Sequence, residues 1–384
     1  MTRREAEVGA AERLARAVEL RLRADVPIAF CLSGGVDSSV LAGIAAKRCG
    51  QRIHTFSVVD ADPRYDERDN IAATVAALGC DSHIVHTSRD GFLDRLARQV
   101  AYHDAPVATI SYYVHEFLSE AIAAHGYKVA ISGTGADELF TGYHDHYVFW
   151  LAQMSGRANF AALLADWRSG YGATVRNPLL QDPLAFARNP AERGHIYLDR
   201  TIFNSLLREP LAEDFFEVSY SGDTLRNRML NELHHEVVPV ILHEDDLDSM
   251  AWSVENRSPY LDRELARFLF TVPTEYLVRD GLAKWLLRAA GAGIVPDSVR
   301  LDRRKRGFNA SIDSLLDRDD AEVRERLLSP GPIFDIVDRG RLAAFLDSDM
   351  SDNAQSKFLF SFASARLFLE TDLASGRVPR AEAA

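Results

Sequence analysis

The chain has 384 residues, of which 47% are hydrophobic and 26% are charged, values that indicate a folded protein with a sizeable core and exclude a disordered or fibrous chain. Its formal net charge of −12 argues against a general attraction to nucleic acid or to an anionic membrane surface. The 3 cysteines show neither a CxxC pair nor zinc-type spacing, which argues against a disulfide framework and a thiolate metal site.

The first part of the chain alternates predicted helices with predicted strands. Its N-terminal residues mix Glu with Arg and lack a continuous apolar segment, so they predict neither a secretory signal nor a membrane span, and we expect a cytoplasmic enzyme. An alternation of strands and helices predicts a parallel sheet covered on both faces, a doubly wound α/β fold. Predicted helices cover residues 11–24, 39–50 and 67–79 and a longer stretch from residue 92, and predicted strands cover residues 28–32, 52–59, 82–87 and 127–133.

The strand signal fades after about residue 150. From there to residue 300 the pattern predicts helices separated by proline and glycine, and neither a repeat nor a low-complexity tract is visible. We therefore predict an α/β portion over residues 1–150 and a largely helical C-terminal portion over residues 151–384.

A glycine-rich turn, SGGVDSS at residues 33–39, follows the first predicted strand. Backbone N–H groups at Gly34 and Gly35, beside a helix N-terminus, favour an anion. The turn matches neither the GxxxxGK(S/T) nor the GxGxxG pattern. Asp37 within it would repel phosphate unless a divalent metal lies between them, and a tight turn with Asp and Ser as helix caps is the alternative.

SGGVDSS resembles the PP-loop of the ATP pyrophosphatases, which grips the pyrophosphate part of ATP while AMP is passed to the substrate. Other stretches are similar to the synthetase domain of the asparagine synthetase and β-lactam synthetase family. The resemblance spans about residues 30–310 and implies the PP-loop ATP pyrophosphatase fold, adenine nucleotide α-hydrolase-like, with ATP and Mg²⁺ as cofactors. The similar stretches are YDERDNIAATVAALGCDSHIV (65–85), SGTGADELFTGY (132–143), SMAWSVENRSPYLD (249–262), KWLLRAA (284–290) and RRKRGF (303–308).

The resemblance implies roles for individual residues. Asp37 and Asp137 match the two carboxylates that hold magnesium, and Glu138 is expected to ligate metal or to orient the site. Lys305 matches a lysine that stabilises charge in the acyl-adenylate and tetrahedral steps, and Lys284 matches one that contacts the phosphates. Contacts to ATP and pyrophosphate are expected from Ser33, Gly34, Gly35, Asp37, Ser38, Ser39, Ser57, Val58, Ser132, Gly133, Lys284 and Lys305.

Other interpretations of these residues stay open. Asp137 as a helix cap is one, and a solvated positive face around Lys284 and Lys305 is another. Glu255 is expected to be catalytic, because a glutamate near this position partners a tyrosine in lactam-forming relatives; the alternative is an Arg–carboxylate pair that only holds a loop. The arginines around Lys305 are Arg300, Arg303, Arg304 and Arg306.

The chain also departs from the family pattern. The second residue is Thr2 and the PP-loop begins early, so we expect no N-terminal glutaminase domain of the family's cysteine type. Thr134 replaces the glutamate of SGEG, and its hydroxyl is too weakly basic to deprotonate an amine. Asp104 stands where the family often has Asp-Glu-Pro. Candidate acceptor or proton-transfer residues are Thr134, Tyr143, His144, Asp145, His146 and Glu255, and a metal role for the His-x-His pair is a weaker alternative.

These expectations converge on an ATP-dependent amide-forming ligase, asparagine synthetase-like, that adenylates a carboxylate and transfers the acyl group to ammonia or a small amine. Its expected partners are a small-molecule carboxylic acid and a nitrogen donor, with a separate glutaminase or biosynthetic chain left open, and neither nucleic acid nor membrane. The alternatives are an intramolecular lactam- or macrolactam-forming cyclase and a non-catalytic nucleotide-binding subunit.

Overall fold

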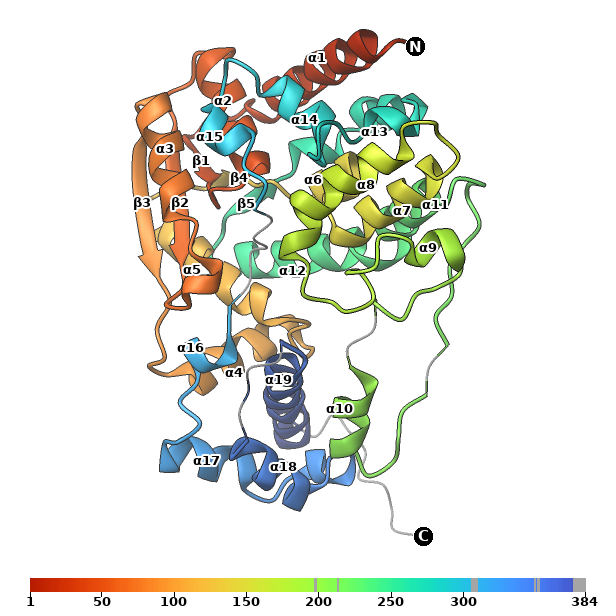
Figure 1. Ribbon diagram of the computed structural model, residues 1–384. Helices are drawn as coiled ribbons and strands as arrows, with labels where there is room; N and C mark the ends of the chain where they lie inside the picture. The colour runs from red at the N-terminus through yellow and green to blue at the C-terminus, as the bar shows by residue number, and fades with distance from the viewer. Residues whose placement is uncertain (197–198, 213, 305–309, 349, 351–352, 376–384) are drawn as a thin grey trace.

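The computed structural model describes residues 1–196, 199–212, 214–304, 310–348, 350 and 353–375 (Figure 1). Its sheet has five parallel strands in the order β3-β2-β1-β4-β5. The first four are the predicted strands, so the α/β parallel fold is confirmed. The strands are β1 (Ile28–Cys31), β2 (His54–Val59), β3 (Asp81–His86), β4 (Val129–Ile131) and β5 (Glu255–Arg257).

Helices follow the strands and make up most of the remaining chain. None of the described helices is both long and apolar enough to cross a membrane. The α-helices up to Leu206 are α1 (Arg3–Arg21), α2 (Val36–Lys47), α3 (Arg68–Leu78), α4 (Phe92–His103), α5 (Ile110–Ala124), α6 (Ala136–Phe140), α7 (His144–Met154), α8 (Phe160–Ser169), α9 (Ala185–Arg188) and α10 (Arg200–Leu206). The later ones are α11 (Thr224–Asn231), α12 (Val238–Met250), α13 (Arg263–Thr271), α14 (Trp285–Ala290), α15 (Asp297–Arg300), α16 (Ile312–Leu315), α17 (Ala321–Leu328), α18 (Arg339–Leu346) and α19 (Asn353–Ser375).

Short single-turn segments complete the regular structure. They are the 3₁₀ turns η1 (Pro63–Tyr65), η2 (Tyr171–Thr174), η4 (Pro259–Leu261), η5 (Thr274–Tyr276) and η6 (Pro332–Asp335), and the π-helical turn η3 (Glu232–Glu236).

Both faces of the sheet are buried at its middle strands β1, β2 and β4, where neighbouring residues point to opposite sides. Phe30 and Ile131 belong to a large apolar cluster that includes residues of α1 and α2. Ala29 and Ala130 belong to another cluster, which they share with residues of α5. Helices therefore cover the sheet on both sides, as the doubly wound interpretation predicts.

The last strand was not predicted. β5 lies far along the chain from β4, yet it pairs with β4 in parallel, with Val129 opposite Glu255 and Ile131 opposite Arg257. Its three residues, ENR, are polar and carry no strand periodicity, so the sequence pattern gave no signal for it. The crevice between β1 and β4 is where the strand order reverses, the usual ligand position in such sheets.

The apolar core is shared across the predicted boundary at residue 150. One cluster joins residues of α1, α2 and β1 to residues of α7, α13 and α14. A second cluster joins α4 and the start of α5 to the C-terminal helices, and Figure 1 shows α19 beside α4, away from the sheet. The division into residues 1–150 and 151–384 stays a prediction.

The helical stretch that begins at residue 92 is two helices rather than one. α4 ends at His103. Its C-cap residue, Asp104, is exposed and adopts a left-handed conformation with φ of 53°, and Pro106 prevents the helix from continuing. The preceding residue, His103, is buried between the carboxylates of Asp248 (3.0 Å) and Glu244 (3.4 Å) on α12. This cluster ties α4 to α12.

We expect His103 to make stability depend on pH. Burial by itself would lower the pKa of His103, but the hydrogen bonds and charges of Asp248 and Glu244 outweigh it and raise the pKa to about 9. A raised pKa contributes stability that is fully present below the unfolded value of about 6.5 and is lost as the pH rises through about 9. Urea unfolding should show the His103→Gln variant on the order of 2 to 3 kcal/mol less stable than the unsubstituted protein at low pH, with the difference shrinking at high pH.

The exposed His125 provides the matched control for this measurement. His125→Gln should leave both the stability and its pH dependence nearly unchanged. A His103→Gln deficit of the same size at pH 6 and pH 10 would contradict the expectation, since it would indicate a loss of packing without titration.

Candidate active site

The PP-loop turn connects the end of β1 to the start of α2. Gly34 has φ of +89°, and a Cβ atom there would lie 2.9 Å from both Cβ and the backbone oxygen of Glu67. Only glycine fits this position without strain. Gly35 is the N-cap of α2 and has no side-chain capping bond, so the helix N-terminus faces the crevice with its backbone N–H groups.

The serines predicted to contact ATP in and near the loop divide into two sets. Ser33 and Ser38 bind each other through their Oγ atoms (3.1 Å), and Ser33 Oγ also accepts from the Gly35 backbone N–H (3.3 Å), so they shape the turn. Ser39 and Ser57 are buried away from it. Ser39 Oγ binds Thr74 on α3 (3.1 Å), and Ser57 Oγ donates to the backbone of Leu32 (2.6 Å). The structure therefore gives these last two serines a supporting position rather than a ligand-facing one.

Lys284 brings together the two predicted metal carboxylates. Its Nζ atom lies 2.6 Å from Asp37 Oδ2 and 2.5 Å from Asp137 Oδ1. The lysine side chain is only 5% exposed, whereas the carboxylates of Asp37 and Asp137 are 23% and 22% exposed. The solvated-face alternative is wrong for Lys284, because its ammonium is enclosed by the crevice.

Close packing restricts the side-chain positions of Lys284, Asp37 and Asp137. Lys284 has φ of 57°, an uncommon conformation for a residue with a side chain, and it precedes α14. A Cβ atom on Gly142 would lie 1.6 Å from Asp137 Oδ1 and 2.2 Å from Lys284 Cε. Tyr260, which is fully buried, donates its hydroxyl to the backbone oxygen of Asp37 (2.8 Å).

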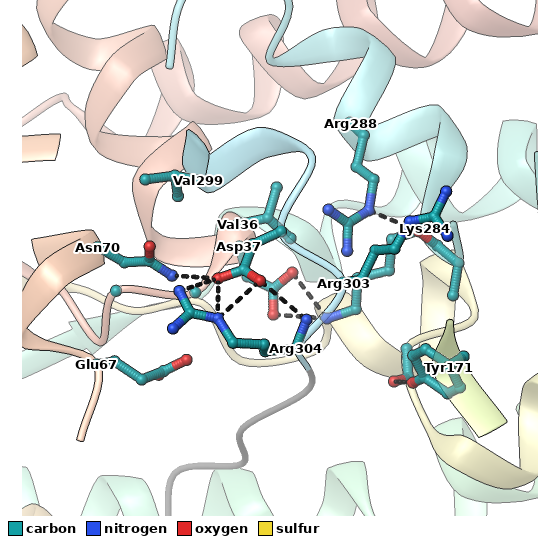
Figure 2. A pocket seen from close by; sticks show the side chains of 15 residues that line it. Val36, Asp37, Glu67, Asn70, Tyr171, Lys284, Arg288, Val299, Arg303 and Arg304 are labelled. Atoms are coloured by element: carbon teal, nitrogen blue, oxygen red, sulfur yellow. Dashed lines mark hydrogen bonds and ion pairs between the residues drawn. The ribbon is translucent and has the colours of Figure 1, made fainter. Parts of the chain in front are cut away.

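A pocket opens beside Lys284, and Figure 2 shows its lining. The PP-loop forms one side, with Asn70 of α3 next to it. On the other side the buried Arg288 donates to the backbone of Ala283 (2.7 Å), and Arg304 binds the carboxylate of Asp302 (2.6 Å). The lining is thus rich in donors and cations, as an anionic ligand requires.

Not every arginine near residue 305 faces this pocket. Arg300 is paired with Asp297 (2.8 Å), and Arg303 donates to the backbone of Asp280 (3.1 Å) while also lining the pocket. Lys305 and Arg306 lie outside the described residues, so the role predicted for Lys305 stays a prediction.

Glu138 points into the protein beside the two predicted metal carboxylates. It is 1% exposed, and Tyr143 donates its hydroxyl to Glu138 Oε1 (2.5 Å). Burial and the neighbouring charge of Asp137 raise the pKa of Glu138 to about 7, against the opposing effect of the Tyr143 hydrogen bond. Glu138 therefore orients Tyr143, and a direct metal contact is not what this geometry favours.

The residues after Tyr143 form a buried ionic network. His146 Nε2 lies 2.6 Å from Glu232 Oε2, and Asp145 Oδ2 lies 3.1 Å from His195 Nε2. Ligand atoms of Asp145, His146 and Glu232 lie within 4.8 Å of one another, but Arg228 Nε already reaches Glu232 (3.1 Å) and Asp145 (3.8 Å). A cationic arginine in this position favours a structural network over a metal site.

The other acceptor candidates, His144 and Glu255, lie in different surroundings. His144 begins α7 and packs its ring against Tyr171 (4.8 Å between ring centroids). Glu255 lies at the start of β5, opposite Val129, and thus at the amino ends of the parallel strands, whereas the PP-loop is at their carboxyl ends. Its side chain is 58% exposed and binds Arg257 (2.8 Å). The catalytic role predicted for Glu255 therefore has no geometric support, and the loop-holding alternative describes it.

Thr134 has partners that the sequence pattern did not indicate. Its hydroxyl donates to Asp245 Oδ2 on α12 (3.0 Å) and lies 3.2 Å from the hydroxyl of Ser132. The second oxygen of Asp245 binds His115 of α5 (2.8 Å). A run of acidic residues in a helix usually marks a solvated face, which is why HEDDLD at residues 243–248 drew no prediction.

Comparison with known proteins places the chain in a family. A profile described as asparagine synthase matches residues 9–370. The chain belongs to the asparagine synthase family. The family resemblance drawn from the PP-loop and the downstream stretches is thereby confirmed.

The similar proteins have modest identity to this asparagine synthase family member. Asparagine synthetase (glutamine-hydrolyzing) 1 of Bacillus subtilis is 27% identical over 352 residues, which cover 88% of this chain and 55% of that protein. Amidase chry2 of Gibberella zeae is 27% identical over 345 residues, covering 76% of this chain and 50% of that protein. The chain thus spans about half the length of these relatives.

One solved structure, the U34-tRNA thiolase NcsA of Methanococcus maripaludis, covers 64% of this chain and 78% of its own. It is 14% identical with a TM-score of 0.26, a likeness too remote to bear on what this chain does.

Proposed function

We propose that this chain is an ATP-dependent ligase that adenylates a carboxylic acid, releases pyrophosphate and then joins the acyl group to a nitrogen nucleophile. The observation that carries the proposal is the cluster of Lys284 with Asp37 and Asp137 beside a cation-rich pocket, in a chain of the asparagine synthase family. In the first step a carboxylate oxygen attacks the α-phosphorus of ATP, and the bond to the β-phosphate breaks. In the second step the nitrogen lone pair attacks the acyl carbon, and AMP leaves.

The two carboxylates fit a magnesium ion. Oxygen atoms of Asp37 and Asp137 converge on a single nitrogen atom, so one divalent cation can contact both, and carboxylate oxygens are the ligands that Mg²⁺ prefers. When bound there, magnesium neutralises phosphate charge while pyrophosphate leaves. Lys284 supplies a fixed positive charge to the same phosphates from a largely dry position.

The names of the relatives set the order in which candidate substrates are tested. The Bacillus subtilis relative is an asparagine synthetase and the Gibberella zeae relative is an amidase, so L-aspartate is the first acid to test and a panel of other small carboxylic acids is the second. Ammonium chloride is the first nitrogen donor, followed by primary amines and hydroxylamine.

The test measures carboxylate-dependent exchange of labelled pyrophosphate into ATP, and then products in the presence of each donor. We expect exchange to need an acid and Mg²⁺, and oxygen-18 from the acid's carboxylate to appear in AMP. Formation of ADP and phosphate would contradict the proposal. Failure of every acid to support exchange would favour a nucleotide-binding subunit without catalysis.

Mass analysis of the product separates the remaining alternative. An intermolecular ligase incorporates the added nitrogen donor. A cyclase instead produces a product that has lost one water from the substrate and contains no external nitrogen.

A further inference from the structure

We propose that His115, held by Asp245, is the catalytic base that takes the proton from the nitrogen nucleophile, with Thr134 fixing Asp245 at the carboxyl end of β4. The inference rests on the proposed function, because it assigns the second step of that reaction. His115 provides the base that Thr134 alone cannot provide, since a threonine hydroxyl is not basic enough to accept this proton.

The contacts of Thr134, Asp245 and His115 show where these residues lie relative to the sheet. Ser132 and Thr134 come directly after β4, and the intervening Gly133 packs against Asp37, with 3.4 Å between Asp37 Cβ and a Cβ atom placed on the glycine. Asp245 therefore reaches the same edge of the sheet as the phosphate-side carboxylates. Its two oxygens are used separately, one by Thr134 (3.0 Å) and one by His115 Nδ1 (2.8 Å).

The burial of Asp245 and the partial exposure of His115 are consistent with a carboxylate that orients a histidine base. Asp245 is 4% exposed, so its orientation is fixed by its partners, whereas the His115 side chain is 29% exposed. Because Asp245 accepts from Nδ1, the neutral imidazole carries its proton on Nδ1 and its lone pair on Nε2. A carboxylate that orients an imidazole and stabilises the imidazolium is the arrangement used by known histidine bases.

Charges around the imidazole support its basicity. Burial by itself would lower the pKa of His115, but Asp245 and Asp248 raise it overall. Both carboxylates come from α12. From α4, His103 and Gln99 bind Asp248 and hold it in place (3.0 Å and 2.6 Å). Tyr112, one turn earlier on α5, brings its ring edge toward His115.

Amide formation from the acyl-adenylate needs no further reactant. The nitrogen lone pair forms the C–N bond to the acyl carbon, and the bond from that carbon to the AMP oxygen breaks with its electron pair on AMP. The proton lost by nitrogen passes to Nε2 of His115, and Asp245 stabilises the resulting imidazolium.

The experiment separates the two steps in the His115→Gln variant, with L-aspartate first and the panel acids next. We expect pyrophosphate exchange to stay within about threefold of the unsubstituted protein, while amide formation from ammonium falls by about 10² to 10⁴. His125→Gln at the C-cap of the same helix is the matched control and should leave both steps unchanged.

Further variants distinguish a base from a structural residue. Asp245→Asn and Thr134→Val should lower amide formation more than exchange, and Asp245→Asn should lower the His115 pKa in a histidine NMR titration. In the unsubstituted protein, amide formation should rise with pH through a histidine-like pKa, and His115→Gln should abolish this inflection.

Two results would overturn the inference. One is amide formation by His115→Gln at the rate of the unsubstituted protein, and the other is an equal loss of both steps, which would indicate a structural role. Absence of exchange in the unsubstituted protein would instead overturn the proposed function, and the inference with it.

Discussion

Lys284→Met is expected to reduce carboxylate-dependent pyrophosphate exchange by about 10² to 10³, the usual cost of removing one fixed charge that stabilises a transition state. Methionine nearly matches the length of lysine but carries no charge. Without the ammonium, the carboxylates of Asp37 and Asp137 face each other across the crevice with no protein cation between them. Exchange and product formation should therefore fall together.

The control is the same substitution at Lys47, an exposed residue in the last turn of α2. Lys47→Met should leave exchange within experimental error of the unsubstituted protein. Exchange by Lys284→Met at half the normal rate or more would remove the principal support for assigning the phosphate site to this cluster.

Gly142→Ala is expected to abolish activity by steric displacement. An alanine Cβ would occupy space that Asp137 Oδ1 and Lys284 Cε already fill, at 1.6 Å and 2.2 Å, so at least one of these side chains must move. Overpacking of this kind costs about 1 to 3 kcal/mol of stability. We expect exchange to fall by at least 10²-fold, because small misplacements of catalytic groups have effects of this size.

Gly156→Ala is the matched control, since a Cβ atom there meets no heavy atom within 4 Å. Exchange assays and urea unfolding should show that Gly156→Ala behaves like the unsubstituted protein. Normal exchange in Gly142→Ala would mean that the carboxylate and lysine can rearrange without loss, contrary to a preorganised site.

The sequence predicts most of the α/β portion because its strands are short apolar runs bounded by turns. The PP-loop is equally predictable from the sequence, since Gly34 has a backbone conformation and a close contact with Glu67 that only glycine tolerates. Asp37, Asp137 and Lys284 were assigned by resemblance, and the structure brings all three together.

What the sequence could not predict depends on long-range pairing. Glu255 was expected to be catalytic because a glutamate near this position partners a tyrosine in lactam-forming relatives. The parallel register of β5 instead sets Glu255 at the far end of the sheet. Asp245 and His115 escaped notice because their meeting depends on how α12 packs against α5.

The late position of β5 has a consequence for how the chain folds during synthesis. Until residues 255–257 have been made, the outer edge of β4 has backbone N–H and C=O groups with no strand to pair with. An open apolar edge of this kind recruits other chains, so nascent or truncated forms that end before β5 should be prone to aggregation. The most polar strand of the sheet is thus also the one that protects it from self-association.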